Sequence, residues 1–377
     1  MYYFWILMQD KILNIVAFDN PYPPNYGGVI DVYYKIKALY EIGFEIHLHC
    51  FVKEIPKEYH ELQLITASVN FYKTDVKWYH IFSSLPISVI SRRNHNLIKN
   101  LLSNNAPILF ESLKTTCLVS DIRIKNRVKL LRLHNLEQNY FKGIAKSERN
   151  LLKKYFFFKE AKKFESYEVW NSFDLVLTLS EFENLYLIQK KISTRYVPVF
   201  HGNKEVGRLS EFGQNILFHG DLSTPDNLKV GLFLIDVFKE LPDYELVIAS
   251  SCKKEMIESR ICNIPNITFV DLVDFNHLLE LFEQAHICIS WSFQNSGTKL
   301  KLINALFNSR FSLINENIID DNKIVALCSV ARNKEELKYK IKETMIKPYS
   351  FSNFENRKLV LESYLNDAIN ANRIQND

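Results

Sequence analysis

The chain has 377 residues, of which 47% are hydrophobic and 24% charged, a composition typical of a globular protein that excludes a disordered or fibrous one. This length exceeds what one hydrophobic core usually organises, so it predicts two domains. The formal net charge of +4 favours anionic partners but gives no indication of nucleic-acid binding.

The sequence predicts a cytoplasmic protein. Residues 2–8 are apolar, but this segment is too short to cross a hydrocarbon layer of about 30 Å. It has no basic leader and no cleavage site, so we expect neither a signal peptide nor a transmembrane helix. The six cysteines are scattered without a C-x-x-C pair, which argues against a zinc site or a disulfide framework and favours reduced thiols.

The first half of the chain alternates between strand and helix patterns. We expect a strand at 12–18, a turn-rich loop at 20–28 and a helix at 29–42 that Gly43 ends. Further strands are expected at 44–51, 107–110, 128–133 and 175–179, each followed by a helical pattern. Ser180 is expected to cap the helix after the last of these strands. This alternation predicts βα units on a parallel sheet.

A second βα series begins near residue 215. Its strands are expected at 216–219, 245–249, 267–270, 286–290 and 312–315. Residues 196–203 are expected to form a short strand that runs into a polar break, so we place the domain boundary at 200–205. The predicted fold class is α/β, with two Rossmann-like doubly wound parallel-sheet domains, 1–200 and 201–350, facing an interdomain cleft.

Small residues and lysines follow the strand expected at 286–290. Gly297 and Thr298 are expected to open a helix whose first turn carries Lys299 and Lys301. Free backbone N–H groups and the positive end of a helix bind anions, so this place suits a diphosphate. From the residues alone, an ordinary loop with solvated lysines fits equally well.

His134 comes at the end of an apolar strand, beside Asn135. An imidazole there can donate a hydrogen bond to a sugar hydroxyl, or it can be a structural residue, and the local sequence does not separate the two. Gly27 and Gly28 precede a helix. They can allow a phosphate or an acceptor to approach the backbone closely, or they can simply form a tight turn.

Five motifs occur in the order in which they occur in one enzyme family. They are PPNYGG at 23–28, RLHN at 132–135, VLTLSE at 176–181, ILFHGDL at 216–222 and GTKLKLINA at 297–305. With these motifs, the chain from Lys11 to its last helix resembles the GT-B glycosyltransferases. The resemblance is to the retaining, metal-independent group (glycosyl transferases group 1, family 4-like) that includes bacterial enzymes of polysaccharide and glycolipid synthesis.

The resemblance implies roles for particular residues. The first domain would bind the acceptor, the second a UDP- or GDP-linked sugar, and the helix in 351–377 would cross back onto the first domain. His134 would orient the donor sugar, and Lys299 would neutralise charge as the sugar–phosphate bond breaks. Residues implied at the donor diphosphate are Gly220, Gly297, Thr298, Lys299 and Lys301. Asn304 would contact the ribose, and Tyr26, Gly27 and Gly28 would form the acceptor or phosphate loop.

The same resemblance implies a hexosyltransferase that moves a sugar with retention to a saccharide or lipid-linked saccharide, without a cofactor or metal. Two positions depart from the family pattern. Asp221 follows Gly220 where many relatives have a basic residue, and Asn304 stands where relatives usually have an acidic ribose ligand. Because of these departures, one alternative to a transferase is a protein that binds nucleotide or glycan without turnover. A second alternative is an enzyme of another reaction, a nucleotide-sugar epimerase or a phosphorylase.

Residues 141–170 are rich in lysines and aromatic residues, and Ser147 and Glu148 are expected to start a helix there. A basic, aromatic amphipathic helix can lie on an anionic membrane, here the inner membrane face. The alternative is a helix that packs one face on the sheet and leaves its lysines solvated. Acidic residues in the same stretch argue against nucleic-acid binding.

Overall fold

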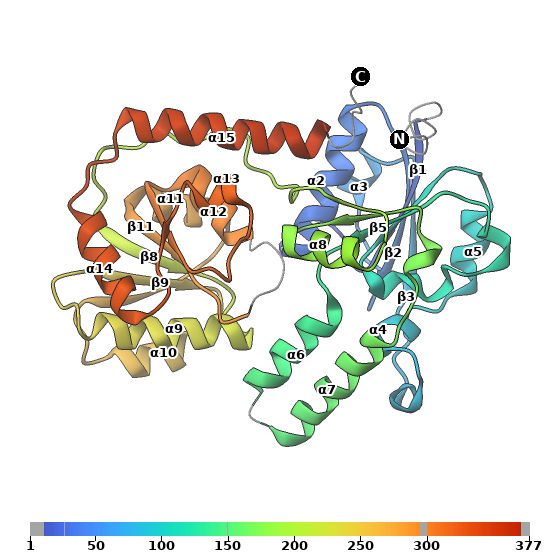
Figure 1. Ribbon diagram of the computed structural model, residues 1–377, viewed down its shortest axis with the longest axis horizontal. Helices are drawn as coiled ribbons and strands as arrows, with labels where there is room; N and C mark the ends of the chain where they lie inside the picture. The colour runs from blue at the N-terminus through green and yellow to red at the C-terminus, as the bar shows by residue number, and fades with distance from the viewer. Residues whose placement is uncertain (1–10, 26, 149, 295–299, 371–377) are drawn as a thin grey trace. The chain divides into compact units, whose positions relative to one another are not determined.

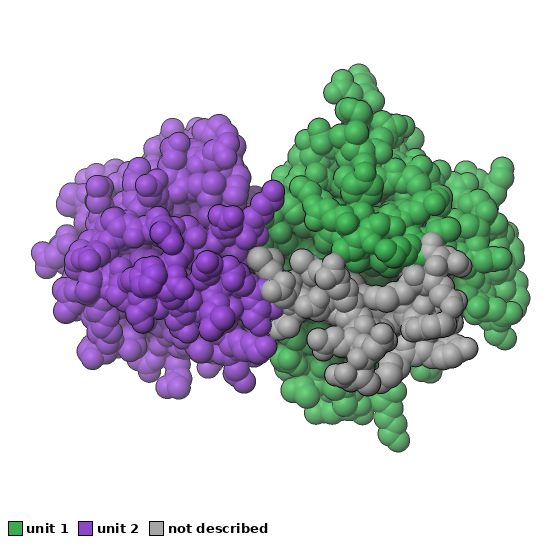
Figure 2. All heavy atoms as spheres, turned by 90° about the horizontal axis from the view of Figure 1, so that it is seen from above, with its two compact units in different colours: residues 1–145, 150–202, 365–377 green, residues 146–149, 203–364 purple. Residues whose placement is uncertain are grey.

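The computed structural model describes residues 11–25, 27–148, 150–294 and 300–370. The chain forms two compact units, coloured separately in Figure 2. Unit 1 comprises residues up to 145, residues 150–202 and the chain from 365, and unit 2 comprises residues 146–149 and 203–364.

The described part of unit 1 is built on a seven-stranded sheet in the order β3-β2-β1-β4-β5-β6-β7. Every neighbouring pair of its strands is parallel. The strands are β1 (Ile12–Ala17), β2 (Glu45–Val52), β3 (Ser68–Lys73), β4 (Ile108–Glu111), β5 (Lys129–Leu133), β6 (Leu175–Thr178) and β7 (Thr194–Tyr196). The central strands β1, β4 and β5 are buried almost throughout, as expected for a parallel sheet with both faces covered.

Helices cover both faces of this sheet (Figure 1). They are α2 (Gly27–Glu41), α3 (His60–Gln63), α4 (Ile87–Ile90), α5 (His95–Leu101), α6 (Glu137–Ser147), α7 (Leu151–Glu165) and α8 (Glu181–Gln189). Short 3₁₀ helices are η1 (Trp78–Phe82), η2 (Leu113–Leu118), η3 (Ile122–Ile124) and η4 (Trp170–Ser172). Ile15 belongs to the same buried cluster as Ile36 of α2, while its neighbour Val16 belongs to another, which includes Phe164 of α7. This alternation fixes the doubly wound arrangement.

The described part of unit 2 contains a six-stranded parallel sheet in the order β10-β9-β8-β11-β12-β13. Its strands are β8 (Asn215–His219), β9 (Leu246–Ser250), β10 (Ile267–Asp271), β11 (Ala285–Ser290), β12 (Phe311–Ile314) and β13 (Ser329–Val330). Its helices are α9 (Pro225–Phe238), α10 (Lys254–Ile261), α11 (Phe275–Gln284), α12 (Leu300–Asn308), α13 (Asn322–Val325), α14 (Lys334–Met345) and most of α15 (Phe351–Asn370). Helices α9, α10 and α14 pack on one face of the sheet, and α11 and α12 on the other (Figure 1).

The observed elements confirm the predicted fold class and correct some details. The strand expected at 196–203 is wrong, because β7 ends at Tyr196. The helix start expected at Ser147 is also wrong, since α6 runs to Ser147 and α7 begins at Leu151. The Asn150 side chain caps α7 by accepting hydrogen bonds from the N–H groups of Leu152 and Lys153. Within the described ranges, no helix combines the length and hydropathy that crossing a membrane requires.

Candidate functional site

Unit 1 holds a buried group of charged side chains at the carboxyl ends of its central strands. Glu111 is the last residue of β4, Arg132 lies in β5, and α2 supplies Asp31 and Lys35. The Lys35 ammonium lies 2.9 Å from Asp31 Oδ2 and 2.9 Å from Glu111 Oε1, so it joins the two carboxylates. All four side chains are buried.

Arg132 anchors this group to the rest of unit 1. Its Nε and Nη2 donate to the two oxygens of Asp31 at 3.1 and 2.9 Å. Its remaining N–H groups donate to the backbone carbonyls of Thr178, Val197 and Pro198. Because a guanidinium has five N–H donors and all five are used, Arg132 is a structural residue of the RLHN motif.

The charges of this group balance. Burial raises the pKa of Asp31, but the positive charges of Arg132 and Lys35 lower it by more. The pKa of this carboxyl is therefore well below its ordinary value. Burial likewise raises the pKa of Glu111, and Lys35 and His134 bring it below its ordinary value. Both carboxylates are therefore ionised at neutral pH, and the two negative charges are matched by Lys35 and Arg132.

This balance bears on metal binding. Asp31, Glu111 and His134 each offer a ligand atom, and these atoms lie within 4.8 Å of one another. A metal ion at that place would have to displace the Lys35 ammonium, which already contacts both carboxylates. The donor set therefore suits an internal ion-pair network better than a divalent cation.

His134, predicted to orient the donor sugar, borders the same group. It is buried, and its Nε2 lies 2.9 Å from Glu111 Oε2. The edge-on ring of Phe18, with ring centroids 5.2 Å apart, holds the imidazole from another side. The Glu111 contact fixes the orientation of the ring, as a carboxylate does for many functional histidines.

The glycine loop in front of α2 differs slightly from the prediction. Gly27 and Gly28 do not precede the helix but form its first turn, because α2 begins at Gly27. A Cβ atom on Gly27 would have no heavy atom of the described residues within 4 Å, so those residues leave space beside this turn. Tyr26, the other residue predicted here, lies outside the described residues.

In unit 2, Lys301 lies in the first turn of α12 and reaches the end of the sheet. Its Nζ donates to the Trp291 carbonyl at 2.9 Å and to Asn227 Oδ1 at 3.3 Å. The same ammonium lies 5.5 Å from the centre of the Phe218 ring. The other predicted diphosphate residues of this segment, Gly297, Thr298 and Lys299, lie outside the described residues.

Gly220 and Asp221 form the turn between β8 and α9. A Cβ atom on Gly220 would lie 3.1 Å from Asn227 Nδ2, so the glycine lets Asn227 approach the backbone. Asp221 Oδ1 accepts hydrogen bonds from the Ser223 N–H at 2.8 Å and the Cys252 thiol at 3.2 Å. The departure at 221 therefore has a structural use, because this carboxylate closes the turn that starts α9.

Asn304, predicted to contact the ribose, belongs to a chain of side-chain amides. Its Oδ1 accepts a hydrogen bond from Asn203 Nδ2 at 2.9 Å. Asn308 Nδ2 donates to Asn203 Oδ1 and to the Asn304 carbonyl, both at 2.9 Å. A ribose hydroxyl that donates to Asn304 Oδ1 would share this oxygen with Asn203.

Two residues that the sequence analysis did not select also lie at the carboxyl ends of the unit 2 strands. Burial, and then the charge of Lys301, lower the pKa of His219 to about 4, so its imidazole is neutral at pH 7. In the described part of the chain, its buried Nε2 has no hydrogen-bond partner.

Asp226, in the first turn of α9, accepts hydrogen bonds from Ser292 Oγ at 2.6 Å and the Phe293 N–H at 3.0 Å. It therefore ties α9 to the loop that leaves β11.

The sequence also contained a signal for the charged group of unit 1 that the sequence analysis did not use. Asp31 and Lys35 are one helical turn apart on the same face as Val32 and Ile36, which are buried. Charged residues on the apolar face of a helix need partners, so this spacing could have indicated a buried ion pair. The third partner, Glu111, is 76 residues from Lys35, and no local pattern indicates that contact.

Two Rossmann-like units, each with a parallel sheet covered on both faces, define the GT-B fold. Solved structures agree along nearly the whole chain. The protein is similar to sucrose-phosphate synthase from Thermosynechococcus elongatus, with a TM-score of 0.68 and 15% identity over 96% of this chain and 97% of that one. It is also similar to an E. coli structure described as trehalose-6-phosphate bound with UDP-2-fluoro glucose, with a TM-score of 0.62 and 10% identity over 96% and 97%.

Among curated sequences, the chain is 27% identical over 315 residues to an uncharacterized 44.6 kDa protein in the cps region of Klebsiella pneumoniae. The match covers 79% of this chain and 81% of that protein. No family model matches the chain. At these identities the comparisons establish the GT-B fold.

Proposed function

We propose that the protein is a retaining glycosyltransferase that moves a sugar from a nucleotide-sugar donor to a saccharide or lipid-linked saccharide. The observation that carries the proposal is the agreement of the fold with GT-B structures over 96% of the chain, including one bound with UDP-2-fluoro glucose. In sheets of this kind, ligands bind outside the carboxyl ends of the strands, and each unit, taken by itself, has polar side chains at those ends.

The proposed donor site lies in unit 2. Its described part contains Lys301, the neutral imidazole of His219, and Gly220 at the end of β8. His219 and Trp291 both interact with Lys301, and each has a buried ring nitrogen, His219 Nε2 and Trp291 Nε1, without a hydrogen-bond partner among the described residues. Buried polar atoms usually have a partner, so these two support a polar ligand here. From the sequence motif, we assign Lys299 and the backbone N–H groups of Gly297 and Thr298, which lie outside the described residues, to the same proposed diphosphate site.

The proposed role of His134 is to position the donor sugar. Since Nε2 is held by Glu111, the sugar hydroxyl would meet Nδ1. If Nε2 carries the proton that Glu111 accepts, Nδ1 is the acceptor nitrogen and can receive a hydroxyl hydrogen bond. Glu111 then sets the tautomer on which donor orientation depends.

The proposal needs no divalent metal. Lys299 would neutralise charge on the leaving diphosphate, a task that lysines or metal ions perform in different transferases. In unit 1, Asp31 and Glu111 are already neutralised by Lys35 and Arg132, so these carboxylates are poor candidates for a metal centre.

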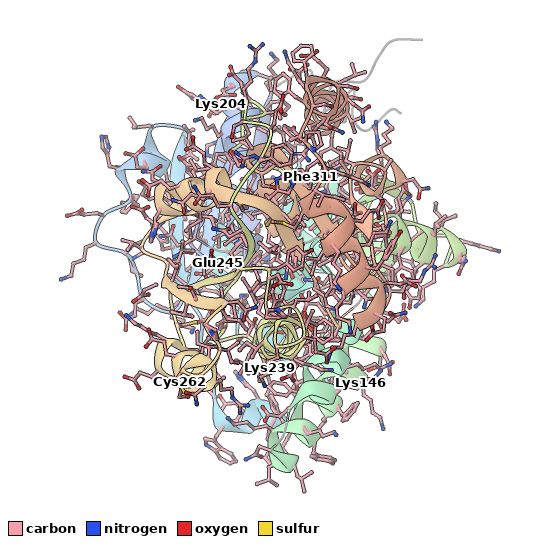
Figure 3. All side chains as sticks on the ribbon, turned by 90° about the vertical axis from the view of Figure 1, so that its left-hand side faces the viewer. Lys146, Lys204, Lys239, Glu245, Cys262 and Phe311 are labelled. Atoms are coloured by element: carbon pink, nitrogen blue, oxygen red, sulfur yellow. The ribbon has the colours of Figure 1, made fainter. Side chains whose placement is uncertain are left out.

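Thermal-shift measurements with UDP, GDP and their sugars, in the presence of a chelator, test the donor site. We expect one nucleotide to raise the melting temperature, because a ligand that binds the folded state stabilises it. Lys299→Ala should lower the affinity for that nucleotide by more than about tenfold. Lys239→Ala is the matched control. Lys239, labelled in Figure 3, is the exposed C-cap residue of α9, and it pairs with Asp236. A protein that no nucleotide stabilises would contradict the proposal.

A further inference from the structure

Unit 1 has an exposed aromatic segment at residues 76–82, for which the sequence analysis predicted neither a strand nor a functional residue. In and beside η1, Trp78 is 82% exposed and Phe82 76% exposed. Val76 and Tyr79 are exposed beside them. Tryptophan and phenylalanine bury large apolar areas when they have a partner, so leaving both in water is costly.

Helix α7 exposes a second set of apolar side chains. Leu151, Leu152 and Tyr155 are each more than 70% exposed, and Phe158 lies on the same side one turn further. The side of the helix that carries Phe164 is buried against unit 1. The helix therefore has two apolar faces, of which packing within the unit uses one.

The two segments are neighbours in the same unit. Lys163 of α7 donates a hydrogen bond to the Ile81 carbonyl in η1 at 3.4 Å. Glu160 of α7 accepts one from the Ile87 N–H at 2.7 Å, and Figure 1 shows α4 beside the C-terminal end of α7. We call the residues that they expose the aromatic–basic surface. Its apolar members are Val76, Trp78, Tyr79, Phe82, Leu151, Leu152, Tyr155 and Phe158.

Lysines flank these apolar side chains. Lys162 is exposed within the apolar stripe of α7, and Lys154 and Lys159 are partly exposed on its two sides. On the η1 side, Lys77 is exposed but pairs with Asp75 at 3.0 Å. Along α7 from 151 to 162 the one acidic residue is Glu160, which is buried and pairs with Lys163. The exposed charge on this stretch of helix is therefore positive.

We propose that the aromatic–basic surface binds the surface of a bilayer that contains anionic lipids. Aromatic and leucine side chains on one face of a helix, flanked by lysines, are typical of segments that lie in the membrane interface. The apolar side chains would enter the boundary between headgroups and acyl chains, and the lysines would contact anionic headgroups. A second copy of this chain fits less well, because it would bring the same lysines close to one another.

This membrane contact is independent of sugar transfer, so the two proposals fail separately. Co-sedimentation with vesicles tests it, using phosphatidylcholine alone and a mixture of two parts phosphatidylcholine to one part phosphatidylglycerol. We expect the full chain to bind the mixed vesicles, to bind neutral vesicles weakly, and to dissociate as salt screens the lysines. No nucleotide or acceptor is needed in this assay.

Paired variants locate the contact. Trp78→Ser with Phe82→Ser, and separately Leu151→Ser with Tyr155→Ser, should each lower the vesicle partition coefficient by more than about tenfold. Phe351→Ser is the control, since Phe351 is 69% exposed on α15 in unit 2 and should have no effect. All five side chains are exposed, and circular dichroism will verify that each variant is folded.

Charge and fluorescence give two further readouts. Lys159→Glu with Lys162→Glu should abolish the preference for anionic vesicles, whereas Lys239→Glu should not. Insertion of Trp78 should shift tryptophan emission to the blue, and Trp78→Phe should remove the shift. The proposal is overturned if the chain binds neither vesicle, or if Phe351→Ser weakens binding as much as the surface variants. A concentration-dependent dimer that the surface variants dissociate, without vesicle binding, would assign the surface to a second copy instead.

Discussion

Replacing Lys35 by methionine removes the ammonium group between two buried carboxylates. Its Nζ lies 2.9 Å from both Asp31 Oδ2 and Glu111 Oε1. Asp31 keeps both contacts with Arg132, so the loss falls mainly on Glu111. Breaking a buried ion pair by removing one partner costs about 3–5 kcal/mol, because an uncompensated charge stays buried. We therefore expect Lys35→Met to lower the free energy of unfolding by about 4 kcal/mol at neutral pH.

This loss should depend on pH. In the wild-type protein the pKa values of Asp31 and Glu111 lie below their ordinary values of 3.8 and 4.5. Their contribution to stability is present above those values and is lost as the pH falls through the lower pKa values of the folded state. In Lys35→Met, burial raises the pKa of Glu111 with less to oppose it, so protonation relieves the buried charge. The deficit of the variant should then narrow as the pH falls from 7 toward 5.

Urea unfolding followed by circular dichroism at several pH values measures both effects. Lys37→Met, on the same helix but outside the charged group, should change the free energy of unfolding by less than about 0.5 kcal/mol. A loss for Lys35→Met below about 1 kcal/mol, the size typical of an exposed ion pair, would refute the reasoning. So would a larger loss that stays constant with pH.

Three further predictions concern other parts of the chain. His134→Gln should lower the rate of sugar transfer by about a hundredfold while nucleotide affinity, measured by calorimetry, stays nearly constant. Asn304→Glu should strengthen nucleotide binding by about 1 kcal/mol if the ribose lies beside this residue. Unchanged affinity would show that Asn304 does not contact the ribose. Arg357→Leu should lower the free energy of unfolding by about 3 kcal/mol, because buried Arg357 donates to the carbonyls of Ser309 and Arg310, which would lose their partner. A loss within the error of urea unfolding would contradict that last assignment.

The sequence predicted the interior strands of both sheets, and the edge strand β10, because they are apolar or alternating runs between polar loops. β3, β7 and β13 were not predicted, and each has partly exposed residues and lies at an edge of its sheet. A short strand with polar residues on one side has no signal that separates it from a loop. α7 was placed three residues too early, because Ser147 and Asn150 are both acceptable caps and only Asn150 is used.

The candidate site was predictable to a smaller extent. His134 was selected by the resemblance of its motif to the GT-B pattern, since its place at the end of a strand left a structural role open, and the structure adds the Glu111 contact that holds it. That contact joins residues 23 apart at the carboxyl ends of two neighbouring strands, and such register is a property of the sheet rather than of a motif. Asp221 was interpreted as a missing basic residue, but its hydrogen bonds within the turn become visible only in the structure.

The central claim is that this chain transfers a sugar from a nucleotide-sugar donor. Proton NMR of the stabilising nucleotide sugar, incubated with the protein, a chelator and a panel of mono- and disaccharides, tests it most directly. We predict that the anomeric signal of the donor disappears, that free nucleotide forms, and that a new glycosidic signal keeps the donor configuration, with His134→Gln nearly inactive. A donor that is bound but stays intact, or whose sugar is converted without release of nucleotide, would contradict the claim.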